Sequence, residues 1–167
     1  MGVSHSRRHF LKGDFQQQLT PLRPPWALEE MQFTDNCSGC GRCISACPTG
    51  LLIAGAGKYP QVDFSRGECT FCQQCVASCD DQAFNDPAQT VPWLLKAKLT
   101  PQCLANHGVV CSVCRDYCEY DAIRITYKTG GRVMPKVIAN SCTACGACVS
   151  VCPTRALSVT HSGDHHE

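Results

Sequence analysis

The 167-residue sequence contains sixteen cysteines, close to a tenth of the chain, and has a formal net charge of +1. This balance gives no reason to expect a nucleic-acid partner, and without an apolar run of about 18 residues we expect no transmembrane segment. Such cysteine enrichment indicates disulfides, zinc sites or iron–sulfur sites, and the spacing must choose among them.

The first 36 residues contain no cysteine. The letters SRRHFLK at residues 6–12 match the twin-arginine export pattern, but no apolar segment or small-residue cleavage site follows. We therefore expect a basic, flexible start in which the match is accidental; an exported protein and a recognition element for export-linked partners are the alternatives. The letters RPPW at residues 23–26 predict a stiff, extended tether with an aromatic anchor.

Four cysteine motifs follow, and repeats of this kind indicate the architecture. Three of them have the spacing C-x2-C-x2-C-x3-C, whereas the third motif has seven residues between its first two cysteines. Gaps of 21 and 23 residues pair motif one with motif two and motif three with motif four. In chain order the motifs are Cys37, Cys40, Cys43, Cys47; Cys69, Cys72, Cys75, Cys79; Cys103, Cys111, Cys114, Cys118; and Cys142, Cys145, Cys148, Cys152.

Each motif predicts a loop that leads into a short helix near its third and fourth cysteines, and Pro48 and Pro153 are expected to stop two of these helices. Residues 123–127 alternate apolar and polar as a half-buried strand does, with a turn at 129–131 and a return strand at 133–138. Residues 61–64 are the weaker equivalent, and 157–159 predict a closing strand. Residues 55–58 lack phosphate-loop spacing and predict a turn.

The stretch from residue 80 to residue 102 contains three prolines and predicts a connection, with a short helix near 93–98. The predicted fold is α+β, with two tandem bacterial-type ferredoxin modules that each hold two [4Fe–4S] clusters. We assign residues 1–30 to a flexible N-terminal segment, 31–86 to the first module, 87–101 to the connection, 102–160 to the second module and 161–167 to a polar tail.

The spacing favours iron and sulfur because three thiolates in one tight loop can wrap a cubane cluster, while the fourth must approach from elsewhere. In two-cluster bacterial ferredoxins the fourth cysteine of each run binds the other cluster. The predicted ligand sets are therefore crossed: Cys37, Cys40, Cys43 and Cys79; Cys69, Cys72, Cys75 and Cys47; Cys103, Cys111, Cys114 and Cys152; Cys142, Cys145, Cys148 and Cys118. Such small modules bury little apolar area, so we expect the clusters to supply much of the folding free energy.

The alternatives fit the spacing less well. Structural zinc favours separated C-x2-C pairs, and disulfides need an oxidising compartment. Cys103 is the least secure ligand because of its seven-residue gap, and the alternative is a free buried cysteine. Arg42, Arg66 and Arg155 are candidates for tuning reduction potentials, with ordinary surface arginines as the alternative. His161 and two later histidines indicate a solvated tail rather than a metal site.

No nucleophile–base pair or acid–base dyad is evident in the sequence, so we expect no enzyme activity beyond electron transfer. Four clusters with cores of about 2+ and four thiolates each would add roughly −8 to the charge of the chain. A partner with a basic docking face is therefore favoured.

The combination of features resembles the NapF family, the ferredoxin-type accessory proteins of periplasmic nitrate reductase systems. The resemblance covers nearly the full chain. It depends on the basic start, the RPPW segment, the order of the four motifs, the letters GAGKYP at 55–60, the wide gap after Cys103 and the letters GAC at 146–148. Asp80 departs from the usual proline after the second motif.

The resemblance implies a cytoplasmic protein that binds the precursor of the nitrate reductase catalytic subunit and assists its maturation, by cluster loading or reduction, before export. The alternative function is an electron-transfer polyferredoxin that passes electrons to or within a nitrate reductase system. A non-redox zinc scaffold is the third hypothesis.

Overall fold

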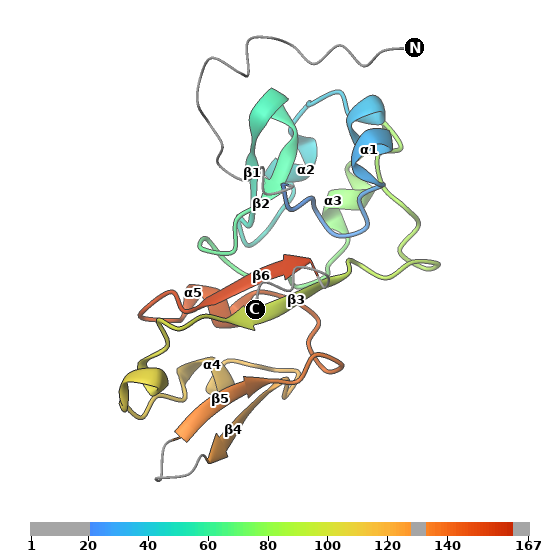
Figure 1. The fold of residues 1–167 in the computed structure, drawn as a ribbon. Helices are drawn as coiled ribbons and strands as arrows, with labels where there is room; N and C mark the ends of the chain where they lie inside the picture. Colours follow the sequence, from blue (N-terminus) through green and yellow to red (C-terminus); the bar gives the residue numbers. More distant parts are fainter. Residues whose placement is uncertain (1–20, 128–132, 162–167) are drawn as a thin grey trace, which may run out of the picture.

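The computed structural model describes residues 21–127 and 133–161 (Figure 1). In this part of the chain the strands form three two-stranded antiparallel sheets, and the α-helices are short. Helix α1 has seven residues and the other four α-helices have four each. The expected mixture of small helices and hairpins is confirmed.

We call residues 21–86 the first half of the molecule. Its elements are α1 (Glu30–Asn36), α2 (Arg42–Ser45), β1 (Leu52–Ala54), the 3-10 turn η2 (Ala56–Lys58), β2 (Pro60–Val62) and α3 (Gln74–Ala77). Strands β1 and β2 pair with Leu52 opposite Val62, and η2 makes the turn expected at residues 55–58. The strand expected at 61–64 begins one residue earlier and ends two residues earlier, because the chain turns away after Val62.

We call residues 87–161 the second half. Its elements are β3 (Leu95–Leu99), η3 (Leu104–His107), α4 (Val113–Asp116), β4 (Ile123–Tyr127), β5 (Val133–Val137), α5 (Ala147–Ser150) and β6 (Leu157–His161). The strands predicted at 123–127 and 133–138 pair as β4 and β5, and the predicted closing strand is β6. The turn expected at 129–131 lies outside the described residues.

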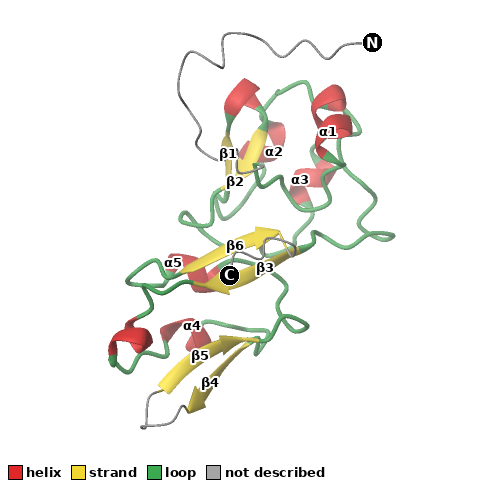
Figure 2. Ribbon diagram, in the orientation of Figure 1, coloured by secondary structure: helices red, strands yellow, loops and turns green. Residues whose placement is uncertain are grey.

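The short helix expected near residues 93–98 is wrong, because this segment contains strand β3. Leu95 pairs with His161 and Leu99 with Leu157, so β3 forms a full ladder with β6 (Figure 2). Leu95 and Ala97 are buried on one face while the intervening lysines lie on the other, which is the two-residue period of a strand. Part of the predicted connection therefore belongs to the sheet of the second half.

The short helices end without help from proline. Helices α3 and α4 end at the same place in their motifs as α2 and α5, although Asp80 and Glu119 occupy the positions of Pro48 and Pro153. In all four motifs the helix begins one residue before the third cysteine. Cluster-loop geometry, rather than proline, therefore sets these helices.

Residues 21–30 pack against later residues of the first half and against the start of the second half, instead of extending as part of a flexible segment. Trp26 is 5% exposed, and its indole N–H donates to the Thr90 carbonyl at 3.2 Å. Arg23 donates to both carboxylate oxygens of Glu30, at 2.5 and 2.7 Å, and lies over the rings of Phe33 and Tyr59. The aromatic anchor expected at Trp26 is thus present, held by residues that follow motif two.

One cluster of buried apolar side chains runs through both halves, with cysteines among its members. In the view of Figure 2 the β3–β6 sheet lies between the first half and the β4–β5 sheet. Within the described residues, the structure has no helix with both the length and the apolar character needed to cross a bilayer.

Candidate metal centres

The cysteine loops share a local geometry that follows from their sequence. In the three tight motifs the residue after the second cysteine has a positive φ, namely Gly41 at 77°, Gln73 at 62° and Gly146 at 88°. This left-handed residue reverses the loop so that a helix can begin at once. In motif three the corresponding residue, Ser112, has a φ of −126°, and the chain arrives instead from η3.

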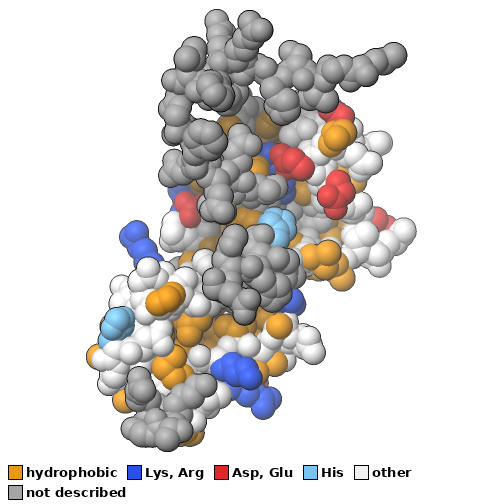
Figure 3. All heavy atoms as spheres, in the orientation of Figure 1, with side chains coloured by type: hydrophobic (Ala, Val, Ile, Leu, Met, Phe, Trp, Pro, Cys, Tyr) orange, Lys and Arg blue, Asp and Glu red, His pale blue; other side chains and the backbone are white. Residues whose placement is uncertain are grey.

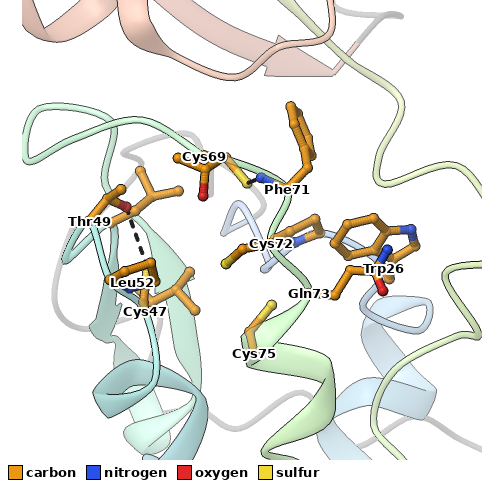
Figure 4. A pocket seen from close by; sticks show the side chains of 13 residues that line it. Trp26, Cys47, Thr49, Leu52, Cys69, Phe71, Cys72, Gln73 and Cys75 are labelled. Carbon is orange, nitrogen blue, oxygen red and sulfur yellow. Dashed lines mark hydrogen bonds between the residues drawn. The ribbon is translucent and has the colours of Figure 1, made fainter.

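The cysteines lie in four groups, each with three cysteines of one motif and the fourth cysteine of its paired motif. We number them site 1 (Cys37, Cys40, Cys43 and Cys79), site 2 (Cys47, Cys69, Cys72 and Cys75), site 3 (Cys103, Cys111, Cys114 and Cys152) and site 4 (Cys118, Cys142, Cys145 and Cys148). Sites 2, 3 and 4 each line one hollow, with volumes of about 350, 330 and 330 Å³ that include space open to solvent. Figure 4 shows site 2.

Site 1, like site 2, contains one exposed cysteine, whereas sites 3 and 4 contain none. In site 1, Cys40 is exposed, whereas Cys43 is buried on helix α2. Burial raises the pKa of Cys43 to about 11, and the charges of Cys37, Cys79 and Cys40 act on it as well. The four thiols of site 1 therefore lie within electrostatic reach of one another.

The third cysteine of every motif is buried. Burial, with smaller contributions from neighbouring thiolates, raises the pKa of Cys43 and Cys114 to about 11 and that of Cys75 and Cys148 to about 12. Several thiolates so close together need a cationic centre to remain ionised. This donor set fits a metal cluster, whose irons would supply that charge.

Backbone amides are aimed at several sulfur atoms. Phe71 N–H donates to Cys69 Sγ at 3.4 Å, Ala122 N–H to Cys118 Sγ at 3.3 Å, and Ala156 N–H to Cys152 Sγ at 3.2 Å. Burial alone would raise the pKa of Cys152, but amide and hydroxyl donors outweigh it and lower that pKa. Such hydrogen bonds to sulfur are one means by which a protein tunes iron–sulfur potentials.

Arg42 is the tuning candidate that the structure places beside a predicted ligand. Its Nε donates to Cys40 Sγ at 3.4 Å, and its guanidinium pairs with Asp80. The hydrogen bond from Arg42 is the main cause that lowers the pKa of Cys40. Asp80, the departure from the usual proline, thus holds the cation that faces site 1, a role that spacing did not reveal.

The neighbouring acid, Asp81, supports the same loop. Its carboxylate accepts from the backbone N–H of Ser38 at 3.1 Å and from the Ser38 hydroxyl at 2.5 Å. Two acids after motif two therefore fix the loop of motif one. Two adjacent acids after a fourth cysteine are the sequence signal that could have suggested this clamp.

The cysteine geometry also bears on the competing chemistries. All sixteen cysteines are free. Within residues 21–127 and 133–161, no three His, Cys, Asp or Glu side chains converge closely enough to hold a single metal ion. Zinc thiolates lie about 2.3 Å from one ion, whereas thiols around a hollow suit a polynuclear cluster.

Cys103 lies with the other three thiols of site 3. It is 7% exposed and caps the 3-10 helix η3, which occupies most of the seven-residue gap. Helix α4 begins one residue before Cys114, so Cys114 holds the place of a third cysteine and Cys103 that of a first. The wide gap therefore contains an inserted turn between the first and second cysteines.

Parts of the chain match family models of iron–sulfur proteins. Residues 36–84 match a 4Fe-4S dicluster domain, and residues 135–158 match a 4Fe-4S binding domain. These ranges contain motifs one, two and four, while motif three lies outside them. The chain thus contains ferredoxin-type sequence that binds [4Fe–4S] clusters.

Several curated proteins are similar over most of the chain. The ferredoxin-type protein NapF of Escherichia coli (strain K12) is 39% identical over 123 residues, which cover 74% of each chain. That of Haemophilus influenzae is 38% identical over 135 residues, covering 75% of this chain and 76% of the relative. The methylamine utilization ferredoxin-type protein MauM of Methylobacillus flagellatus is 33% identical over 124 residues, covering 65% and 52%.

Proposed function

The chain belongs to the family of ferredoxin-type NapF proteins, and on this premise we propose that it is an iron–sulfur accessory protein of a periplasmic nitrate reductase system. In this proposal it acts in the cytoplasm. It binds the precursor of the catalytic subunit and assists its maturation, by cluster loading or reduction, before export. In this proposal the protein transfers electrons or clusters and has no further enzyme activity.

We further propose that sites 1 to 4 each hold one [4Fe–4S] cluster, in two tandem ferredoxin modules with the boundaries expected from the sequence. The grouping of the sixteen cysteines into four crossed sets supports this assignment. When bound, the clusters supply one-electron redox chemistry. The chain's own part is to hold the thiolates, to donate hydrogen bonds to sulfur and to limit contact with water.

The observation that carries the functional proposal is the openness of the first half. Both exposed cysteines, Cys40 and Cys72, lie there, whereas all eight cysteines of the second half are buried or half-buried. A protein that delivers electrons or a cluster to a partner needs a site that the partner can reach. Residues 21–86 contain more acidic than basic side chains, and several acidic ones lie on the face of this half that Figure 3 shows, which favours a partner with a basic face.

The proposal is tested by affinity capture with the full chain from cells growing on nitrate. We expect the unexported precursor of the catalytic subunit to be recovered from the cytoplasmic fraction. In a strain that lacks this chain, we expect the catalytic subunit to contain less iron and sulfide. A capture without precursor, together with a fully loaded catalytic subunit in the deletion strain, contradicts the proposal.

Two matched variants test which cysteine site serves the partner. Cys40→Ser alters site 1 at an exposed cysteine, and Cys111→Ser alters site 3, which has no exposed cysteine. If site 1 serves the partner, Cys40→Ser restores less iron to the catalytic subunit than Cys111→Ser does. Equal rescue by the two variants contradicts the role of site 1 in delivery.

An electron-transfer polyferredoxin is the second candidate, because sites in the two halves adjoin. The amide of Cys69 in site 2 is hydrogen-bonded to the carbonyl of Cys145 in site 4. This function predicts that deletion abolishes whole-cell nitrate reduction while the catalytic subunit keeps its full cofactor content. The iron and sulfide content of that subunit therefore separates the two candidates.

A further inference from the structure

The two halves meet at a contact between predicted cluster ligands. The backbone N–H of Cys69 donates to the backbone carbonyl of Cys145 with an N···O distance of 2.7 Å. Cys69 is the first cysteine of motif two and lies in site 2. Cys145 is the second cysteine of motif four and lies in site 4. One hydrogen bond thus joins a ligand loop of each half.

The residue after Cys145 allows this close approach. Gly146 has a φ of 88°, and a methyl group added to it would overlap the ring of Phe64 in the first half. Phe64 is 6% exposed, and its ring packs edge-on against Trp93 with centroids 5.8 Å apart. The ring therefore has little room to move aside.

Trp93 also contacts the loop of motif four. Its indole N–H donates to the carbonyl of Thr143 at 2.9 Å, within motif four. The Trp93 ring also packs edge-on against Phe71, at a centroid distance of 5.8 Å, and Phe71 lies in the loop of motif two. One tryptophan therefore contacts both cysteine loops that meet at the hydrogen bond.

We propose that this junction, formed by Cys69, Cys145, Gly146, Phe64 and Trp93, is the electron-transfer contact between the two halves. Electrons then visit the sites in the order 1, 2, 4, 3, which differs from the order of the motifs along the chain. In each step the donor site loses one electron and the acceptor site gains it, and no atom is transferred. The first electron comes from a low-potential one-electron donor.

The physical reason is proximity through covalent and hydrogen bonds. Cys69 and Cys145 are both predicted ligands, so the path between their sites needs only two cysteine residues and one hydrogen bond. Sites 1 and 2 are joined within the first half because their motifs exchange the fourth cysteines, and sites 3 and 4 are joined likewise. The junction therefore completes one continuous path. The inference rests on the proposed loading of all four sites.

The test uses a matched pair of glycine variants in the full chain. Gly146→Ala adds a methyl group that forces Phe64 and the loop of motif four apart. Gly41→Ala occupies the same position in motif one, with a φ of 77°, but a methyl group there meets no atom within 4 Å. Both variants impose left-handed strain on alanine, and only Gly146→Ala disturbs the junction.

Proteins are purified anaerobically, analysed for iron and sulfide, fully reduced with dithionite and examined by electron paramagnetic resonance. We expect Gly146→Ala to lose part of the spin–spin interaction of the wild type and Gly41→Ala to keep it. Hydrogen exchange of the Cys69 amide should be about tenfold faster in Gly146→Ala, because a hydrogen bond of ordinary strength is lost. An unchanged Gly146→Ala spectrum, or equal losses in both variants, overturns the inference.

A milder variant keeps the test decisive if Gly146→Ala does not fold. Trp93→Phe keeps an aromatic ring, although a smaller one, and removes the N–H donor to Thr143, so a smaller loss of spin–spin interaction is expected; no loss overturns the inference. Wild-type iron below about sixteen atoms, with site 2 or site 4 unfilled, overturns it together with the cluster assignment. Full iron with unchanged spectra in both variants overturns the junction alone.

Discussion

The two halves carry similar motifs yet differ in charge and in exposure of their cysteines. Residues 21–86 contain eight Asp and Glu against four Lys and Arg, whereas residues 87–161 contain three against eight. The exposed cysteines lie in the acidic half, and none lies in the basic half. Similar ligand spacing therefore supports two environments, one open and acidic and one enclosed and basic.

The halves also differ in how the first and last segments of each half pair with each other. In the second half, strand β3 before motif three and strand β6 after motif four form a five-residue ladder. In the first half, the corresponding segments meet at one isolated bridge, between Ala27 and Phe84. Side chains, chiefly Trp26 and Arg23, hold the first half instead of a ladder. We infer that the first half depends more on its clusters than the second half does.

Among the changes that test this difference between the halves, removal of the clusters should have the largest effect on stability. Chelation under anaerobic reducing conditions should unfold much of the chain, because metal binding supplies much of the folding free energy of such small modules. Amides of β1 and β2 should lose protection from hydrogen exchange before those of β3 and β6. Simultaneous loss in the two halves, or retention of native circular dichroism, contradicts the comparison.

Truncation of the aromatic anchor gives the next largest effect. Trp26→Ala should destabilise the first half by about 3–5 kcal/mol, the usual cost of removing a buried Trp side chain. The measurement is the temperature at which visible cluster absorbance is lost, with hydrogen exchange to assign the loss to the first half. Met31→Ala is the control, because Met31 is 77% exposed and should change stability little. Equal effects of the two substitutions contradict the anchoring role.

Removal of the Arg42 cation at site 1 gives the smallest of the expected effects. Arg42→Gln removes the donor that lowers the pKa of the Cys40 thiol, so in the apo protein this pKa should rise. At a mildly alkaline pH the thiolate fraction and the alkylation rate of Cys40 should then fall, and the difference should vanish once pH exceeds both pKa values. Arg115→Gln is the control, since Arg115 pairs with Asp116 in the second half. Mass spectrometry of alkylated peptides gives the rates, and equal rates for Cys40 in both variants contradict the assignment.

Arg42 should also affect a reduction potential of the protein when its clusters are bound. A positive charge beside a cluster favours its reduced form, so Arg42→Gln should lower one reduction potential and leave the others near their wild-type values. Asp80→Asn should shift the same potential in the opposite direction, because it removes the acid that pairs with Arg42. Redox titration followed by electron paramagnetic resonance measures both shifts. A shift of the same sign in both variants contradicts this electrostatic explanation.

Much of the architecture could be predicted from local spacing. The short helices, the β4–β5 hairpin and strand β6 were expected because their signals lie within a few residues of each other. Strand β3 was missed because its Leu-Lys-Ala-Lys-Leu sequence contains good helix formers, and its partner β6 lies some sixty residues later. Trp26 was expected to be an anchor, but its partners could not be predicted because they lie beyond motif two.

By itself, the sequence determined the number and spacing of the cysteines, their crossed grouping into metal-binding sets as an expectation, and the family to which the chain belongs. Those features depend on residue identity and short spacing. Only the tertiary structure decided that site 2 and site 4 adjoin, that Asp80 holds Arg42 at Cys40, and that both exposed cysteines lie in the first half. These depend on contacts between residues far apart in the chain, which packing and hydrogen bonding select after the local loops have formed.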